Sequence, residues 1–248
     1  MRDILITAPA RQDPKIFHEH RKSIENLIVP DDCNIHVLYV INESDELIPE
    51  LDPGDKYVKF NNPEPYSKVD NNHLWTLQNM LNVGHMRNYT INYCLVNGFD
   101  YWFSVDTDIV LDPHTLVTLL DADKDIVSEV FWTTSKDGEW CNAWMYDQCD
   151  GMSEEWKKPG LYRVGMTGAC TLVKHKVLKA GVNYDRIPNI VESLVGEDRH
   201  FCVRAAVHGF EMWLDTHYPA FHIYTEEMYH KYMQMLFEKS IIDGAGGK

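Results

Sequence analysis

The chain alternates between short apolar runs and longer segments in which apolar residues recur every three or four positions. Apolar runs of this kind, bounded by turn residues, are typical of buried β-strands. The first run ends at Pro9, and the second, NIHVLYVI at 34–41, is rich in β-branched side chains. Such runs predict strands at 4–8, 34–41, 57–60, 99–105, 125–131 and 211–214, and a further apolar segment lies at 164–173.

The helical segments show a different spacing. Met86, Tyr89, Tyr93 and Val96 recur at helical steps, and Gly98 follows as a stop signal. This spacing predicts a helix over 83–96. Weaker versions of the same pattern predict helices at 15–27, 113–120, 199–208 and 226–242.

Because strands and helices alternate, the sequence predicts an α/β fold with a mostly parallel central sheet and helices on both faces. Periodicity is lost at 132–162 although aromatic residues persist there, so we expect an irregular, aromatic-rich subregion. We expect a single domain over residues 1–242 and a flexible tail at 243–248. In sheets of this kind, ligands bind at the carboxyl ends of the strands.

Composition narrows the function classes. The 248 residues include 23 Lys and Arg against 38 Asp and Glu, a formal net charge of −15. This acidity disfavours phosphate backbones and anionic lipid, so we expect no nucleic-acid partner. No apolar stretch reaches the ~20 residues of a membrane helix and no signal peptide is recognisable, which predicts no transmembrane segment and a cytoplasmic location. The six cysteines include no Cys-x-x-Cys pair and are expected to be reduced thiols.

The sharpest chemical feature is the pair of carboxylates at the end of a predicted buried strand, Asp106-Thr107-Asp108. Residues two positions apart leave a strand on the same side, so both carboxylates can address one ligand. Carboxylates this close repel each other unless a cation neutralises them, and hard oxygen ligands suit Mg²⁺ or Mn²⁺. A pair of solvated loop acids is the alternative interpretation.

Three further groups of residues fit chemistry near those carboxylates. Arg87 and Asn88, in the preceding helix, suit diphosphate and ribose oxygens, unless the arginine only braces its helix through ion pairs. Glu197 and Asp198 precede a predicted helix and act either as helix caps or as a general base in an apolar cleft. His222 is either structural or the third metal ligand that the Asp pair lacks.

Tryptophans are concentrated in the irregular region. Sugar rings stack their C–H faces on indole rings, so these side chains are candidates for binding an acceptor sugar. Packing of a loop-rich subregion is the alternative. The four candidates are Trp132, Trp140, Trp144 and Trp156.

Taken together, these segments resemble a known family. The quoted runs are RN at 87–88, NGFDYWFSVDTD at 97–108, GMTGA at 165–169, GEDRHFCVR at 196–204, and WLD at 213–215 followed by His222. In this order they are similar to the motifs of nucleotide-sugar glycosyltransferases of the GT-A fold, particularly family 2, and the resemblance runs from about residue 3 to 224.

The resemblance implies a nucleoside diphosphate sugar as donor, a UDP- or GDP-sugar, and a divalent cation, Mn²⁺ or Mg²⁺, held by Asp106, Asp108 and His222. Where the family usually has an Asp-rich segment after its second strand, this chain has INESD at 41–45, so an amide or Glu43 would replace the carboxylate that contacts the base. The donor-binding residues implied are Thr7, Ala8, Pro9, Arg11, Asn42, Glu43, Arg87, Asn88, Asp106, Thr107 and Gly168.

The resemblance also implies the reaction, an inverting sugar transfer to a glycan or other hydroxyl acceptor, with Asp198 as base and Glu197 holding the acceptor. Residues 1–112 would bind the nucleotide sugar, 113–225 the acceptor, and 226–242 would form a C-terminal helix. Two alternatives remain: a catalytically silent carbohydrate-binding protein of the same fold, and a sugar nucleotidyltransferase. The latter would need a glycine-rich basic loop after the first strand, which the sequence lacks.

Overall fold

The computed structural model describes residues 1–42, 45–61, 68–69, 72–73, 76–135, 138–145, 154–188, 190 and 196–245. Its helices and 3₁₀ turns are α1 (Pro14–Glu25), η1 (Asp45–Glu50), α2 (Leu77–Asn97), α3 (Thr115–Asp121), η2 (Glu154–Lys157), α4 (His175–Lys179), α5 (Glu197–Val207) and α6 (Glu226–Ala245). Its strands are β1 (Arg2–Ala10), β2 (Cys33–Asn42), β3 (Lys56–Phe60), β4 (Lys68–Val69), β5 (Asn72–His73), β6 (Tyr101–Ser104), β7 (Ile109–Val110), β8 (Ile126–Ser135), β9 (Gly138–Cys141), β10 (Ala143–Trp144), β11 (Leu161–Val164), β12 (Met166–Thr167), β13 (Thr171–Lys174) and β14 (Met212–His222).

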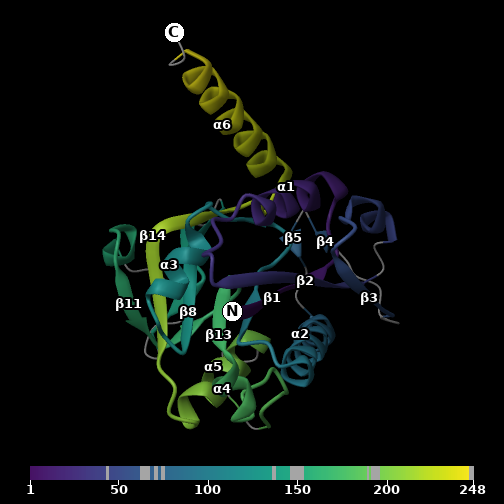
Figure 1. Ribbon diagram of the computed structural model, residues 1–248, viewed down its shortest axis with the longest axis vertical. Helices are drawn as coiled ribbons and strands as arrows, with labels where there is room; N and C mark the ends of the chain where they lie inside the picture. Colours follow the sequence, from purple (N-terminus) through teal and green to yellow (C-terminus); the bar gives the residue numbers. More distant parts are fainter. Residues whose placement is uncertain are drawn as a thin grey trace.

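The central sheet has the strand order β11-β14-β8-β13-β6-β1-β2-β3 (Figure 1). β1 pairs in parallel with β2 and β6, β2 with β3, and β8 with β14. β13 runs antiparallel between β6 and β8, and β11 is antiparallel to β14. The predicted α/β class with a mostly parallel sheet is confirmed.

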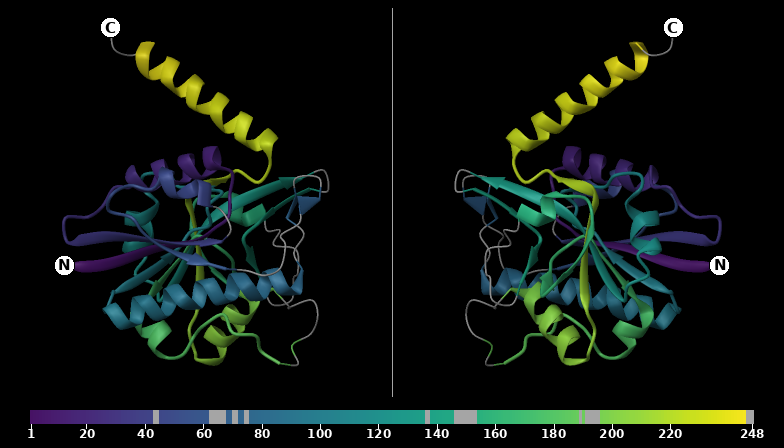
Figure 2. Two further views of the ribbon diagram at one scale, coloured as in Figure 1. Left: turned by 90° about the vertical axis from the view of Figure 1, so that its right-hand side faces the viewer. Right: turned by 90° about the vertical axis from the view of Figure 1, so that its left-hand side faces the viewer.

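Two hydrophobic cores lie on opposite faces of this sheet, because alternate residues of a strand point to opposite sides. Leu5 and Trp102 pack with residues of α2, α4 and α5, whereas Ile4, Ile6 and Phe103 pack with residues of α1 and α3. Figure 2 shows α2 along one face and α1 on the other. Within the described residues, five cysteines are buried and free of disulfide bonds.

β1 continues beyond its predicted end at Ala8. Pro9 and Ala10 remain paired with β2, whereas the pairing of β1 with β6 ends at Thr7. Because β1 is paired on one side only at this point, a proline without an N–H group is tolerated there. The strand thus carries the chain to the edge of the sheet before the loop begins at Arg11.

α2 begins six residues earlier than predicted, at Leu77, where the side chain of Thr76 accepts a hydrogen bond from the backbone of Asn79. Gly98 ends the helix as predicted, in a left-handed conformation with φ 71°. The apolar spacing was interrupted by Asn79 and Asn82, which are nevertheless buried, at 5% and 6% exposed. Both border the cavity described below.

The aromatic-rich region is more regular than predicted. β9 forms a hairpin with the extended end of β8, and β10 pairs with β12. The segment predicted at 164–173 is divided among β11, β12 and β13. β14 continues past its predicted end at Leu214, with an irregularity between Asp215 and Ala220. Polar residues and Pro219 at this irregularity had concealed the strand.

α6 projects away from the rest of the molecule (Figures 1 and 2). It continues to Ala245, so the first residues of the predicted tail at 243–248 are helical. The base of α6 is anchored where Lys15 Nζ donates to Glu226 Oε1 at 2.6 Å and where Tyr229 packs against the body. None of the described helices is long and apolar enough to span a membrane.

Candidate active site

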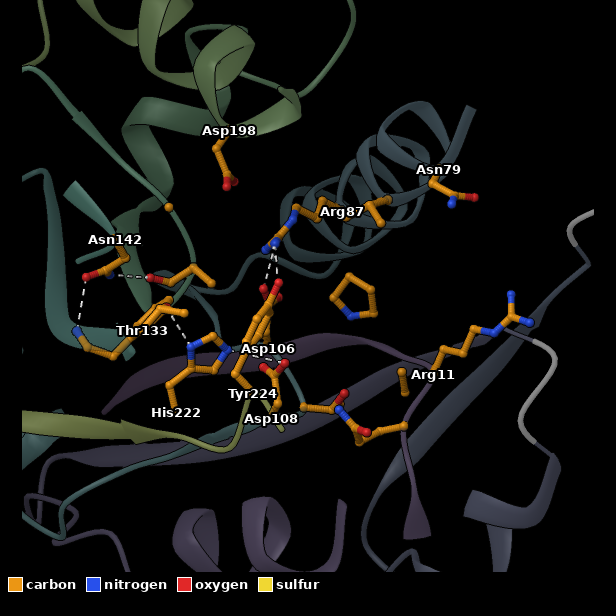
Figure 3. A pocket seen from close by; sticks show the side chains of 18 of the residues that line it. Arg11, Asn79, Arg87, Asp106, Asp108, Thr133, Asn142, Asp198, His222 and Tyr224 are labelled. Carbon is orange, nitrogen blue, oxygen red and sulfur yellow. Dashed lines mark hydrogen bonds and ion pairs between the residues drawn. The ribbon is translucent and has the colours of Figure 1, made fainter. Parts of the chain in front are cut away.

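A cavity of about 410 Å³ opens at the carboxyl ends of β1, β2 and β6 (Figure 3). It is bounded by the loops after β1 and β6, by α2, and by β8 to β10. This is the edge at which open α/β sheets place their ligands. The residues predicted from the sequence that border it are Pro9, Arg11, Asn42, Arg87, Asp106, Thr107, Asp108, Trp140, Trp144, Gly168, Asp198 and His222.

Arg87 reaches the cavity from α2 and orients Asp106. Its Nη1 donates to Ser104 Oγ at 2.6 Å, and its Nη2 donates to both carboxylate oxygens of Asp106, at 2.9 and 3.2 Å. Burial alone would lower the pKa of Arg87, but the carboxylates of Asp106 and Asp198 outweigh burial and raise that pKa above its ordinary value. Arg87 is therefore a permanent buried cation with a fixed geometry.

Asp108 and His222 face each other across the cavity wall. Nε2 of His222 lies 3.4 Å from Oδ2 of Asp108, and their side chains are only 9% and 14% exposed. Nδ1 of His222 lies 2.8 Å from Oγ1 of Thr133, and the ring of Phe131 packs edge-on against the imidazole. These contacts hold Nε2 toward the carboxylate of Asp108.

Asp106, Asp108 and His222 do not form a closed ligand set. Within the part of the chain that the structure describes, no group of three or more His, Cys, Asp or Glu side chains is arranged to hold a metal ion. Arg87 Nη2 donates to both oxygens of Asp106, whereas Asp108 and His222 face each other. This arrangement fits a cation that takes one or two protein ligands and completes its coordination with water and substrate phosphates.

Asp198 borders the opposite side of the cavity, at the start of α5 (Figure 3). Burial raises the pKa of Asp198 to about 6, against the lowering effect of Arg87. Its Oδ1 is buried, with no hydrogen-bond partner among the described residues. Glu197 does not border the cavity, and burial together with Asp198 raises the pKa of Glu197 to about 8. Burial thus makes both carboxylates hold a proton more readily than a solvated carboxylate does, and Asp198 is the one placed to exchange a proton with a ligand in the cavity.

Gly168 lies opposite Asp198 and leaves its carboxylate accessible. A Cβ at Gly168 would come within 3.3 Å of Asp198 Oδ2 and 3.7 Å of the Trp144 ring. The guanidinium of Arg199 lies over the same ring, 5.2 Å from its centroid. Trp144 thus forms an aromatic wall beside the carboxylate.

Asn142 holds this wall against β8. Its Oδ1 accepts a hydrogen bond from the backbone N–H of Phe131 at 3.0 Å, and its Nδ2 donates to the carbonyls of Glu129 and Ala169 at 3.0 and 2.9 Å. Its own carbonyl accepts from the N–H of Gly168 at 2.7 Å. The side-chain amide therefore joins segments at a point where β13 no longer pairs with β8.

Some predicted donor-binding residues lie away from the cavity. Thr7 and Ala8 are buried within β1, each at 1% exposed, and neither borders the cavity. Asn88 points to the far side of α2, where its amide bonds to the segment around Tyr184. Glu43 lies outside the described residues.

The four tryptophans separate into two pairs. Trp140 and Trp144 border the cavity, as an acceptor-binding role requires. Trp156 is 5% exposed within the core, and Trp132 packs against the same core with Lys157 over its ring, away from the cavity; Trp144 packs against this core as well as bordering the cavity. The packing interpretation therefore accounts for Trp132 and Trp156.

The cavity also has residues that the sequence did not single out: Asn79, Asn82, Val83, Met86, Thr133, Asn142 and Tyr224. One signal was present. Asn79, Asn82 and Arg87 lie at i, i+3 and i+8, which places them on one face of α2. Amides on an otherwise buried helix face indicate a polar cleft, since buried polar groups need partners.

Comparisons with known proteins show the fold. Searches against models of protein families and against curated protein sequences each found no match. The structure is similar to that of Staphylococcus aureus TarS residues 1–349, with TM-score 0.53, 12% identity, and coverage of 88% of this chain and 60% of that chain. The TarS complex with UDP-GlcNAc gives TM-score 0.54, 12% identity and coverage of 88% and 58%, and the complex with UDP gives 0.53, 14%, and 88% and 60%. The chain thus spans about 60% of the TarS chain, and at this identity the likeness establishes a shared α/β architecture.

Proposed function

We propose that the protein is a metal-dependent glycosyltransferase, which moves a sugar from a nucleoside diphosphate sugar to an acceptor hydroxyl. The observation that carries the proposal is that three kinds of group border one cavity. Arg87 is a buried cation, Asp108 faces the imidazole of His222, and Asp198 is a carboxylate of raised pKa. The TarS complexes with UDP and UDP-GlcNAc, which share the fold, support a UDP-sugar as donor.

At the donor end, Arg87 would contribute positive charge to the diphosphate while it orients Asp106 toward the ribose. Asp108 and His222 would hold Mn²⁺ or Mg²⁺: with the imidazole proton on Nδ1, where Thr133 Oγ1 can accept it, the lone pair of Nε2 would face the Asp108 carboxylate. When bound, the cation offsets the charge that develops on the leaving diphosphate.

At the acceptor end, Asp198 would remove the proton of the attacking hydroxyl as the new bond to the sugar forms. Its pKa of about 6 makes it anionic at neutral pH yet basic enough to accept a proton. The rings of Trp140 and Trp144 would support an acceptor sugar beside it. A single displacement of this kind inverts the configuration at the sugar.

The test is calorimetric titration of the protein with UDP, GDP and UDP-GlcNAc, each with Mn²⁺ and with excess EDTA. We expect UDP to bind only with the cation, and Asp108→Asn to lose most of that affinity without a change in Tm. Asp121→Asn, at an exposed carboxylate in α3, is the matched control and should bind like the parent. Equal UDP binding in EDTA would exclude the metal-dependent reading. Glycan binding with no nucleotide binding would favour the silent carbohydrate-binding alternative.

A further inference from the structure

Three residues of the sequence motifs lie outside the cavity and converge on the segment 183–185, between α4 and α5. Asn88 Oδ1 accepts a hydrogen bond from the backbone N–H of Tyr184, and its Nδ2 donates to the next carboxylate, both at 2.7 Å. Arg204 donates to the carbonyls on either side of Tyr184, at 2.6 and 3.0 Å. Phe201 stacks on the ring of Tyr184, with centroids 4.7 Å apart. Two helices, α2 and α5, thus fix this segment.

The segment places the ring of Tyr184 beside the guanidinium of Arg87. The side chain is buried, at 5% exposed, and the Cζ of Arg87 lies 5.4 Å from the ring centroid. The close approach of α2 depends on Gly84, because a Cβ there would lie 3.2 Å from the Tyr184 carbonyl oxygen. A glycine inside a helix is otherwise unfavourable, so its place here indicates that the contact is specific.

Arg87 makes two kinds of contact, hydrogen bonds at the edge of its guanidinium and a cation–π contact with the Tyr184 ring. Ser104 and Asp106 engage the edge of the guanidinium, through Nη1 and Nη2, and so fix it within its own plane. The Tyr184 ring lies within cation–π distance, where the interaction is strengthened because the site is desolvated.

We propose that Tyr184 is a positioning residue: held by Asn88 and Arg204, its ring keeps the guanidinium of Arg87 aligned on Asp106. This assigns Asn88 a role in supporting the arginine beside it in sequence. The consequence for diphosphate binding rests on the proposed function, whereas the alignment of Arg87 does not.

The experiment compares Tyr184→Phe, which keeps the aromatic ring, with Tyr184→Leu, which keeps an apolar side chain but removes the ring. Met212→Ala is the control for lost stability, since Met212 is buried in the same hydrophobic cluster but lies at the amino-terminal end of β14. The first readout needs no ligand: the rate at which the Arg87 Nε–H exchanges with water, measured by NMR and assigned with Arg87→Lys. The second is the affinity for UDP with Mn²⁺.

We expect Tyr184→Phe to match the parent in both readouts. Tyr184→Leu should exchange the Arg87 Nε–H roughly 2- to 30-fold faster and bind UDP more weakly by roughly the same factor. Asn88→Ala should shift both readouts in the same direction. If Tyr184→Leu behaves like Tyr184→Phe, or if Met212→Ala produces the same changes, the positioning role is wrong. A parent protein that binds no UDP counts against the proposed function, while the exchange readout still decides the role of Tyr184.

Discussion

Replacing Asp198 by asparagine should stabilise the fold while it removes the proposed base. Burial raises the pKa of Asp198 from 3.8 to about 6, so the ionised carboxylate is less stable in the folded protein than in the unfolded chain. A shift of about two units corresponds to about 3 kcal/mol, which screening at the cavity wall reduces to about 1–3 kcal/mol. Folding therefore favours the protonated form, and that stability is fully present below pH ~4 and lost as the pH rises through about 6. Asparagine does not ionise and avoids the loss.

Urea and thermal unfolding at pH 4 and pH 8 measure this difference. At pH 8, Asp198→Asn should raise Tm by roughly 3–10 °C, and near pH 4 the two proteins should be nearly equal. At pH 8 the variant should also lose roughly 10²–10⁴ in kcat while donor affinity is retained. Asp121→Asn, at an exposed carboxylate, should show no such pH-dependent gain. A variant that is no more stable than the parent at pH 8, or a gain independent of pH, would refute the reasoning.

Two other substitutions test separate parts of the structure. Trp140→Ala should raise the acceptor KM with little change in Tm, because Trp140 borders the cavity. Trp156→Ala should lower Tm by removing core packing and leave the KM unchanged. The reverse pattern would place the acceptor elsewhere. Gly98→Ala should cost about 1–2 kcal/mol, measured by urea unfolding, because φ is 71° at the end of α2 and nothing lies within 4 Å to clash; an unchanged free energy of unfolding would contradict the left-handed cap.

The fold could be predicted from the sequence wherever a single physical requirement, such as burial on both faces or a left-handed residue, determines the residue type. The second half of β2, from Leu38 to Ile41, and β6 are apolar on both faces because both faces are covered there. Gly98 stops α2 for a conformational reason that is local. The first turns of α2 could not be predicted, because Asn79 and Asn82 turn a buried helix face toward a polar cavity. Periodicity detects burial against an apolar core and fails where the burial is against a ligand site.

The sequence predicts which strand ends and helix starts lie at the site. It does not predict the direction in which each side chain points. Asp106, Asp108 and Asp198 border one cavity because the parallel sheet brings their elements to one edge. Asn88 follows Arg87 by one residue, yet one position along a helix is a turn of about 100°, and its amide faces another segment. Which tryptophans belong to the core depends on contacts between distant segments, and these have no local signature.

The amide of Asn142 has a consequence for how this protein could diversify. A backbone ladder transmits any insertion to its neighbouring strands, but here one side chain makes the bridging bonds to β8 and to the carbonyl of Ala169. The attachment of Asn142 to β8 therefore does not depend on the length of the chain that follows β10. We expect variants with a different segment after β10 to keep the parent's Tm as long as Asn142 and the pairing of β10 with β12 are kept.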